Sequence, residues 1–356
     1  MVDLLWISVE TPCIDGGGGQ RRQFHQISAL VQSGVEVEVA TLSGRQDDST
    51  IRRLAPVHRF DPRPFGTRRN RGLERLIEAV APQQAVVAHV ESVPHVSAEL
   101  QRSGVPFLLD FQNVASRWHS SLGDDSSANE WRRREREGLI AAVQATACSI
   151  EEQGALAELG VGTPITVAPQ GVDPEEWPRA ALSARRGVVV TMFGSWNHGP
   201  NRIAAEWLAL HVWPRVHGVL PEAQLLLLGP SAPPAVVLRQ DGVEFMGRVA
   251  SLAAVLGRAR VAVVPIQRGI GTRVKFIESL ASGAAVVSTT LGCEGFEAEG
   301  TFVQADGPEP FANACIELLR DEPRAVDLGE RGRELAFSRY NWVQVTEPIL
   351  DFARGR

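Results

Sequence analysis

The sequence predicts an α/β protein with two doubly wound domains, each built on a parallel sheet. Short apolar segments alternate with amphipathic helical segments along the whole chain, which is typical of parallel strands covered by helices. A glycine-rich turn follows an apolar segment in each half, at residues 15–19 and 269–271. The length of 356 residues is sufficient for two separate hydrophobic cores.

In the first half, six apolar segments are expected to form strands: residues 3–8, 35–42, 85–89, 106–110, 145–149 and 165–168. A helix is expected over residues 21–33, directly after the glycine run. The polar run at residues 120–129 contains four serines, two aspartates, a glycine and an asparagine. This composition predicts a mobile loop.

In the second half, strands are expected at residues 188–193, 261–265 and 284–287. A helix reaching about residue 216 follows the first of these strands. Residues 272–282 carry Val274, Ile277 and Ala281 at helical spacing, so a second helix is expected there. The glycine turn at 269–271 therefore lies between a strand and a helix.

Composition excludes several classes of function. The net charge of −6 disfavours general nucleic-acid binding. The four cysteines show neither zinc-site nor disulfide spacing, and the eight histidines show no metal spacing, so we expect no metal and a reducing cytoplasm. The first residues lack the features of a signal peptide, and no apolar run approaches the ~20 residues that span a bilayer. Abundant Arg, Ala, Gly and Val suggest a bacterial genome rich in GC.

All 36 basic residues except Lys275 are arginine. Lysine and arginine are not interchangeable where a compact charge meets a phosphate oxygen. The amides of Gly269, Gly271 and Thr272, with the first turn of the following helix, predict an anion site beside Lys275. Glu278, one turn further along, is placed to accept hydrogen bonds from ribose hydroxyls. The alternative is an exposed Lys275–Glu278 ion pair on a solvated helix face.

Polar residues also follow two strands of the first half. Asp110 and Asn113 lie at one strand end, and His89 and Glu91 lie at another. Because ligands of open parallel sheets collect at the carboxyl ends of the strands, these residues are candidate sugar or acceptor contacts, with Asp110 and His89 as catalytic candidates. Alternatively, Asp110 and Asn113 bond the backbone of a turn, and His89 is a structural histidine.

The second half resembles the donor-binding domain of glycosyltransferase family 4. The resemblance rests on residues 229–230, 242–243, 246–249, 265, 269–278, 281–283, 286–289 and 294–295, and it covers most of residues 165–295. It implies the GT-B architecture, in which two Rossmann-like domains face each other across a cleft.

The resemblance also implies the domain boundaries. Residues 169–173 resemble the linker of the family, and the segment from residue 340 resembles its terminal helix, which crosses back onto the first domain. We therefore expect an acceptor domain at 1–172, a donor domain at 173–337 and a crossover helix at 338–356.

Several site residues are implied in the same way. In the family, the residue that matches Glu278 holds the ribose, and the glycine-rich turn holds the diphosphate. The loop that matches Gly17 and Gly18 faces the cleft and touches the diphosphate or the sugar; its alternative is a flexible surface turn. Relatives grip the diphosphate with further basic side chains, for which Arg202 and Arg273 are candidates here.

The implied activity is that of a retaining, metal-independent hexosyltransferase with no cofactor besides its donor substrate. UDP or GDP sugars are the expected donors, and the acceptor is a hydroxyl or amine of a natural product, a polysaccharide or a lipid-linked precursor. Many members carry a sugar-contacting glutamate where this chain has Ile270. Two alternatives stay open, a GT-B epimerase or coupling enzyme and a catalytically silent nucleotide-sugar-binding partner subunit.

A basic cluster precedes a helix of the first half, at Arg63, Arg68, Arg69 and Arg71. Family members that glycosylate lipids use such a surface to contact anionic membranes, so peripheral membrane contact is one expectation. A solvated face and a binding site for a charged soluble acceptor are the alternatives.

Overall fold

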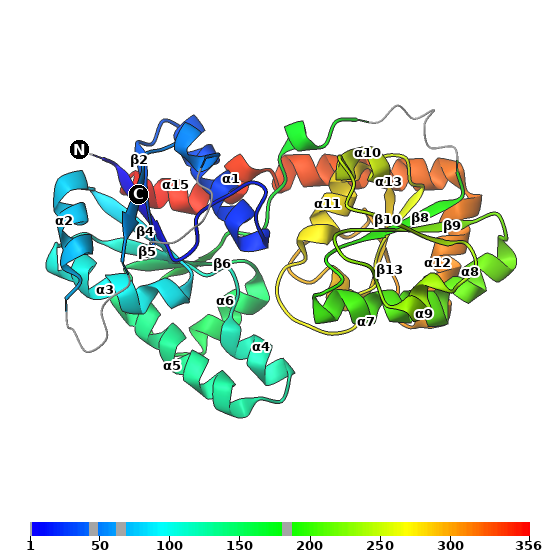
Figure 1. The fold of residues 1–356 in the computed structure, drawn as a ribbon, viewed down its shortest axis with the longest axis horizontal. Coiled ribbons are helices and arrows are strands. Elements are labelled where there is room, and N and C mark those ends of the chain that lie inside the picture. Colours follow the sequence, from blue (N-terminus) through cyan, green and yellow to red (C-terminus); the bar gives the residue numbers. More distant parts are fainter. Residues whose placement is uncertain (1, 43–48, 62–68, 180–186) are drawn as a thin grey trace. The chain divides into compact units, whose positions relative to one another are not determined.

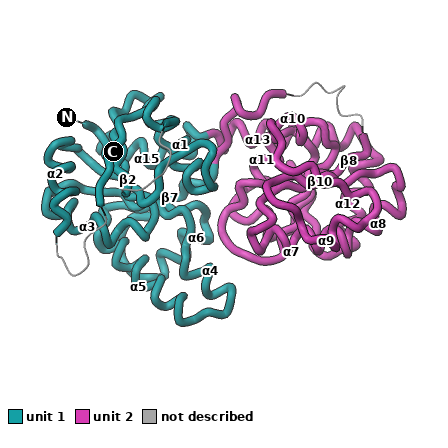
Figure 2. The backbone as a smooth tube through the Cα atoms, viewed as in Figure 1, with its two compact units in different colours: residues 1–170, 342–356 teal, residues 171–341 magenta. Residues whose placement is uncertain are grey.

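The computed structural model describes residues 2–42, 49–61, 69–179 and 187–356. The chain folds into two compact units (Figures 1 and 2). Unit 1 comprises Met1–Gln170 and Trp342–Arg356, and unit 2 comprises Gly171–Asn341. The corresponding boundaries expected from the sequence are residues 172 and 337.

Unit 1 contains a seven-stranded sheet in which every neighbouring pair of strands is parallel. The strand order is β3-β2-β1-β4-β5-β6-β7. The strands are β1 Leu4–Ser8, β2 Val37–Leu42, β3 Val57–Phe60, β4 Gln84–Ala88, β5 Phe107–Asp110, β6 Gln144–Ala147 and β7 Ile165–Val167. The order reverses between β1 and β4, and ligands of open parallel sheets generally bind at such a switch point, beside the carboxyl ends of the strands.

Helices cover both faces of this sheet (Figure 1). They are α1 Gly18–Gln32, α2 Arg71–Val80, α3 Val93–Arg102, α4 Ala115–Ser121, α5 Asp125–Ala141, α6 Ile150–Ala157, α14 Trp342–Val345 and α15 Glu347–Ala353, with short 3-10 turns at Ile51–Arg53 and Val90–Ser92. Because successive side chains of a strand point to opposite faces, β1 feeds two cores. Leu4 and Trp6 pack with Ile349 and Phe352 of the C-terminal segment, whereas Leu5 and Ile7 belong to the core on the other face.

The N-terminus of α1 differs from the sequence prediction, which began this helix at residue 21. The helix begins at Gly18, so Gly18 and Gly19 form its first turn. Gly17 is the N-cap, and its amide donates to Gln20 Oε1 at 3.1 Å. This capping contact stabilises a helical turn that the conformational freedom of its glycines would otherwise destabilise.

The mobile loop predicted at residues 120–129 is wrong. These residues form the end of α4, a short turn and the start of α5. Asp124 caps α5 because its carboxylate accepts from the amide of Ser127 at 3.1 Å. Serine and aspartate are common in disordered segments, but they are also the preferred N-cap residues, and here the cap decides the structure.

Unit 2 contains a six-stranded parallel sheet with the order β10-β9-β8-β11-β12-β13. The strands are β8 Val189–Phe193, β9 Gln224–Leu228, β10 Val243–Gly247, β11 Val261–Val264, β12 Ala285–Ser288 and β13 Val303–Gln304. Here the order reverses between β8 and β11. The two parallel sheets confirm the doubly wound α/β fold that the sequence predicts.

The helices of unit 2 are α7 Gly199–Trp207, α8 Trp213–Val219, α9 Ala235–Leu238, α10 Leu252–Leu256, α11 Val274–Ser282, α12 Pro308–Arg320 and α13 Glu322–Arg339. A π-helical turn, Leu208–Val212, joins α7 to α8, and 3-10 turns lie at Pro174–Glu176 and Thr290–Gly292. Helix α11 starts two residues later than predicted, because Thr272 precedes the helix and Arg273 is its N-cap.

Helices α11 and α13 pack closely where α11 ends. Gly283 ends α11 in the left-handed conformation with φ of 71°, and Gly329 of α13 lies directly against it. A Cβ added to Gly329 would lie 2.2 Å from the carbonyl oxygen of Gly283. No side chain fits at Gly329 without separating the two helices. This packing fixes the C-terminal end of the helix whose N-terminus carries Lys275.

We expect Gly329→Ala to lower the free energy of unfolding of unit 2 by about 3 kcal/mol, because the overlap is with rigid backbone. Gly218→Ala is the matched control, since a Cβ at Gly218 in α8 meets nothing within 4 Å. The control should be stabilised by up to ~1 kcal/mol, the helix propensity difference. Denaturant titration followed by circular dichroism measures both. Equal stabilities of the two variants would contradict the close packing.

Candidate functional site

The principal candidate site lies in unit 2, at the carboxyl ends of β8 and β11. These strands are neighbours at the point where the strand order reverses. Helix α7 begins at Gly199 shortly after β8, and α11 begins at Val274 shortly after β11. Two helix N-termini at a switch point favour the binding of an anion, because their free amides and dipoles carry partial positive charge.

Lys275 joins these two helices. Its Nζ donates a hydrogen bond to Oδ1 of Asn201 in α7, and the amide nitrogen of Asn201 donates to the carbonyl oxygen of Ser195 at 2.9 Å. Among the described residues, Lys275 forms no ion pair with a carboxylate. The alternative to the anion site, an exposed ion pair with Glu278, is therefore not formed, and a neutral amide accepts a hydrogen bond from the ammonium group.

The environment of Lys275 disfavours its charge. Burial and, to a smaller extent, the positive charge of Arg273 lower the pKa of the ammonium group to about 7, although Glu278 acts in the opposite direction. A buried cation without a full counter-charge is costly. An anionic ligand at this point would remove that cost.

The glycine turn places Arg273 beside Lys275. Arg273 donates from Nη1 to the carbonyl oxygen of Ile270 at 2.8 Å, so its guanidinium folds back over the turn. Gly269 has φ of 111°, and a Cβ there would lie 3.1 Å from Arg273 Nη2. Gly271 also has a positive φ, 85°. Glycine is needed at both positions because side chains rarely adopt this backbone conformation.

Two glycines that were not among the predicted site residues also lie at this site. Gly194 follows β8 with φ of 154°, and a Cβ there would lie 3.1 Å from Lys275 Nζ. Gly229 follows β9, and a Cβ on it would lie 1.9 Å from the carbonyl oxygen of Gly194. The backbone can thus approach the ammonium group closely only because both residues lack side chains.

The other predicted site residues of unit 2 differ in their exposure to solvent. Glu278 is buried in α11, one turn beyond Lys275. Thr272 and Gly271 are partly exposed in the loop before α11, whereas Arg202 is exposed on α7. The structure brings Lys275, Arg273 and the glycine turn together, whereas Arg202 forms no hydrogen bond or ion pair with them among the described residues.

Two residues with a clear place in the site were missed. Asn201 holds Lys275, and its only signal in the sequence is its position at the start of a helix after β8. His198 is the N-cap of α7, and its pKa is lowered by burial and by the positive charges of Lys275 and Arg273. Neither role is visible without knowing that α7 and α11 are neighbours.

Unit 1 presents a second group of candidate residues at its own switch point. Gly17 and Gly18 are exposed at the start of α1, after β1. His89 follows β4, which ends at Ala88, one residue earlier than predicted. A Cβ on Gly19 would lie 3.4 Å from His89 Nε2 and 2.6 Å from Gln112 Oε1. The first turn of α1 therefore lies directly against the His89 ring.

Asp110 is fully buried at the end of β5. Its Oδ1 accepts hydrogen bonds from Arg22 Nη2 at 3.1 Å and from Thr146 Oγ1 at 2.6 Å. Arg22 also donates to the carbonyl oxygens of Ala168 and Pro169, at 2.8 and 2.9 Å. The carboxylate thus binds an arginine that the sequence analysis did not select.

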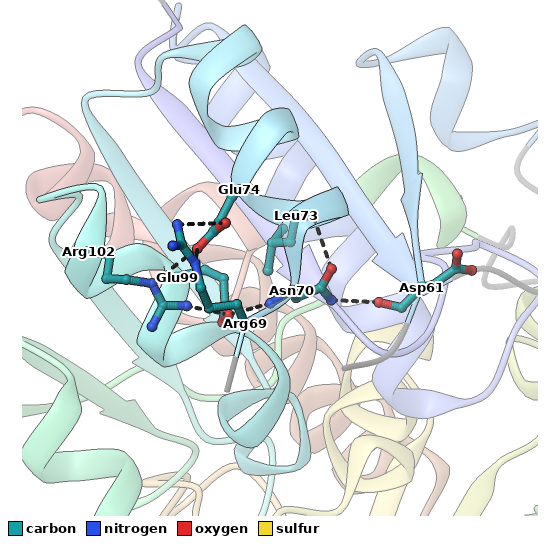
Figure 3. Close-up of polar contacts among 7 residues, drawn as sticks. All are labelled: Asp61, Arg69, Asn70, Leu73, Glu74, Glu99 and Arg102. Carbon is teal, nitrogen blue, oxygen red and sulfur yellow. Dashed lines mark hydrogen bonds and ion pairs between the residues drawn. The ribbon is translucent and has the colours of Figure 1, made fainter. Parts of the chain in front are cut away.

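Only part of the basic cluster lies within the described residues, because Arg63 and Arg68 fall outside them. Arg69 donates from Nε to Glu74 Oε1 at 2.9 Å, and Arg102 donates to the same oxygen at 3.1 Å (Figure 3). These contacts lower the pKa of Glu74, chiefly through the hydrogen bond from Arg69. The charge of Arg69 is therefore compensated within unit 1.

The same network reaches the start of α2. Glu99 is buried and accepts from Arg102 Nη2 at 2.6 Å and from the amide of Asn70 at 2.8 Å (Figure 3). Asn70 caps the helix by accepting from the amide of Leu73. Arg71 is exposed in the first turn. Membrane contact through this surface stays a prediction.

Two further properties bear on possible partners. Among the described residues, no helix combines the length and the apolar character that crossing a membrane requires. Within each unit taken by itself, the described residues bring no three His, Cys, Asp or Glu side chains close enough together to hold a metal ion. The metal-independent reaction stays a prediction.

Comparison with known proteins gives matches in both halves. Residues 187–321 match the family described as glycosyl transferases group 1, and residues 16–176 match glycosyltransferase family 4. A GDP-mannose-dependent alpha-(1-6)-phosphatidylinositol monomannoside mannosyltransferase of Mycobacterium tuberculosis is 34% identical over 127 residues. This match covers 32% of the chain and about a third, 33%, of that relative.

Solved structures resemble the whole chain. HepE of Anabaena in complex with UDP superimposes with a TM-score of 0.76 at 14% identity, covering 100% of both chains. Sucrose-phosphate synthase of Thermosynechococcus elongatus gives a TM-score of 0.75 at 18% identity, covering 99% of this chain and 98% of its own. At these identities the likeness establishes the fold, which is GT-B. The chain belongs to the group 1 and family 4 glycosyltransferases.

Proposed function

We propose that this protein transfers a sugar from a nucleotide diphosphate sugar to an acceptor hydroxyl or amine. The observation that carries the proposal is Lys275, whose partly buried ammonium group is held by the Asn201 amide and not by a carboxylate. Beside it lie Arg273, the glycine turn and the N-termini of α7 and α11. This arrangement is positive and preformed, as a diphosphate site requires.

The chemistry follows from where charge develops. When the bond between the sugar and the diphosphate breaks, negative charge builds on the departing phosphate oxygens. Groups already aimed at those oxygens stabilise the transition state without reorganising, and one such donor is typically worth ~3 kcal/mol. Lys275 is suited to this role because its own cost of burial falls as the anion forms.

Two nucleotides are supported as donors by the relatives. HepE structures contain UDP or UDP-glucose, and the mycobacterial relative is named as GDP-mannose-dependent. We propose a UDP or GDP sugar, with Glu278 as the partner of the ribose hydroxyls. Glu278 fits this role because it lies one turn from Lys275 on the same helix.

Binding of uridine, guanosine, thymidine and adenosine diphosphates tests the proposal by calorimetry. We expect one nucleotide to bind selectively and Lys275→Ala to weaken it by roughly 10²-fold, the usual effect of removing one partner of a buried charge pair. Arg268→Ala is the matched control, because Arg268 is an exposed cation of the same loop. Its affinity should stay close to that of the wild type.

Two results would count against this assignment. If no diphosphate binds, or if Lys275→Ala binds as tightly as the wild type, unit 2 does not hold the donor in this way. Selective binding without any donor turnover in the presence of acceptor extracts would instead favour a nucleotide-sugar-binding subunit. Ile270 keeps that alternative open because it offers the sugar no carboxylate.

The binding should also depend on pH through Lys275. In the free protein its pKa is about 7, and a bound diphosphate raises this pKa by attraction. Above pH 7 the amine must therefore take up a proton when the nucleotide binds, and the affinity should fall by up to about tenfold per pH unit. Calorimetry in two buffers of different ionisation enthalpy measures the uptake. Lys275→Ala should abolish it at pH 8, and uptake that persists in this variant would exclude Lys275 as its source.

We also propose that the reaction retains the anomeric configuration of the donor, as the family resemblance implies. During slow hydrolysis of an α-linked donor, the first sugar released should be the α anomer. Proton NMR recorded before mutarotation distinguishes the two anomers. An initial β anomer would assign an inverting reaction.

A further inference from the structure

Three side chains of unit 1 form a chain that ends at His89. The indole Nε1 of Trp6, in β1, donates to Oε1 of Gln23 in α1 at 3.1 Å. The Nε2 atom of Gln23 lies 3.2 Å from the Nε2 atom of His89. Trp6 and Gln23 have no exposed surface, whereas His89 is partly exposed at the carboxyl end of β4. The first two members are therefore fixed by packing, and the third can reach a ligand.

The chemistry of these groups sets the direction of every hydrogen bond. An indole nitrogen can only donate, so the Gln23 amide must turn its oxygen toward Trp6. Its NH₂ group then faces His89, and because NH₂ also only donates, His89 Nε2 must accept. An imidazole that accepts at Nε2 is neutral and carries its proton on Nδ1. Protonation of Nε2 would bring two donors face to face.

The backbone holds the ring at this place. His89 adopts φ of 67°, which is uncommon for a residue with a side chain, and its amide donates to the carbonyl oxygen of Asp110 at 3.1 Å. Ser92 Oγ bonds the carbonyl oxygen of Ala88 and closes the following turn. On the other side, Gly19 leaves room for the ring, since a Cβ there would lie 3.3 Å from His89 Cε1. Strained backbone of this kind persists where the surroundings fix it, often at functional sites.

We propose that Gln23 is a positioning residue that fixes His89 as a neutral imidazole with its proton on Nδ1, so that His89 serves a ligand of unit 1 as a hydrogen-bond donor and not as a general base. Among the described residues, Nδ1 has no hydrogen-bond partner. The ligand atom that it suits is an oxygen acceptor, such as a hydroxyl of the transferred sugar. The identity of this ligand rests on the proposed function, but the state of the ring does not.

Substitution of Gln23 by glutamate replaces the amide NH₂ group by an oxygen, and it should reverse which ring nitrogen of His89 carries the proton. A carboxylate accepts from Trp6 and His89 alike, so the ring proton moves to Nε2. Gln23→Leu removes both bonds, and Trp6→Phe frees the Gln23 amide to rotate, so both variants should give a mixture of tautomers. Gln32→Glu is the matched control, because Gln32 is exposed at the other end of α1.

Nitrogen NMR of the ligand-free protein, labelled at histidine, reads the tautomer directly; His89→Asn identifies the signals. We expect a protonated Nδ1 and a bare Nε2 in the wild type and in Gln32→Glu, and a protonated Nε2 in Gln23→Glu. A protonated Nε2 in the wild type, or a spectrum that Gln23→Glu does not change, would overturn the proposal.

The role of His89 as a hydrogen-bond donor is tested separately, by measuring the hydrolysis of UDP-glucose and GDP-mannose. We expect Gln23→Glu to lower kcat on the order of 10²-fold while KM changes little, because a misplaced proton affects the reacting state more than binding. A reversed tautomer with unchanged kcat would overturn the donor role. If neither donor binds to the wild type, the proposed function fails, while the spectrum still supports the assignment of Gln23.

Discussion

The buried ion pair between Arg22 and Asp110 is the constraint on which unit 1 depends. Arg22 belongs to α1 and Asp110 to β5, and both are inaccessible to solvent. Taking both charges out of water costs several kcal/mol per ion, so the pair needs further hydrogen bonds to offset this cost. Thr146 supplies one, and the carbonyl oxygens of Ala168 and Pro169 supply the others. One guanidinium therefore joins α1, strand β5 and the segment that leaves unit 1.

Helix α1 also contacts the segment with which the chain returns to unit 1. His25 stacks on Trp342, the first residue of the returning segment, with ring centroids 5.0 Å apart and nearly parallel planes. Between Arg22 and His25, Gln23 reaches His89. Three neighbouring positions of α1 thus bind the outgoing chain, the candidate sugar-contacting histidine and the incoming chain. A shift of α1, whose first turn holds the exposed glycines, would act on all three.

Arg22, which is fully buried, and Lys275, which is partly buried, show two different uses of a cation. Arg22 forms an ion pair with Asp110 and donates to two backbone carbonyl oxygens, so its charge is compensated within unit 1. Lys275 has an amide and a neighbouring arginine, and its pKa falls to about 7. Stability alone would favour a carboxylate partner at this position. Because Glu278 compensates the charge only in part, a ligand that brings negative charge would complete the compensation, and a diphosphate is such a ligand.

The sequence by itself determined the fold class, nine of the thirteen described strands and the glycine turn before Lys275, because these depend on local periodicity and on residues with few backbone options. It did not determine the start of α1, which a capping contact from Gln20 sets, or the helical state of residues 120–129. Only the tertiary structure decided which partners the charged side chains meet. Arg22 meets Asp110 across 88 positions, and Lys275 meets Asn201 across 74. Such pairs leave no periodic signal in one sequence, since the topology of the sheets, and not sequence spacing, brings the partners together.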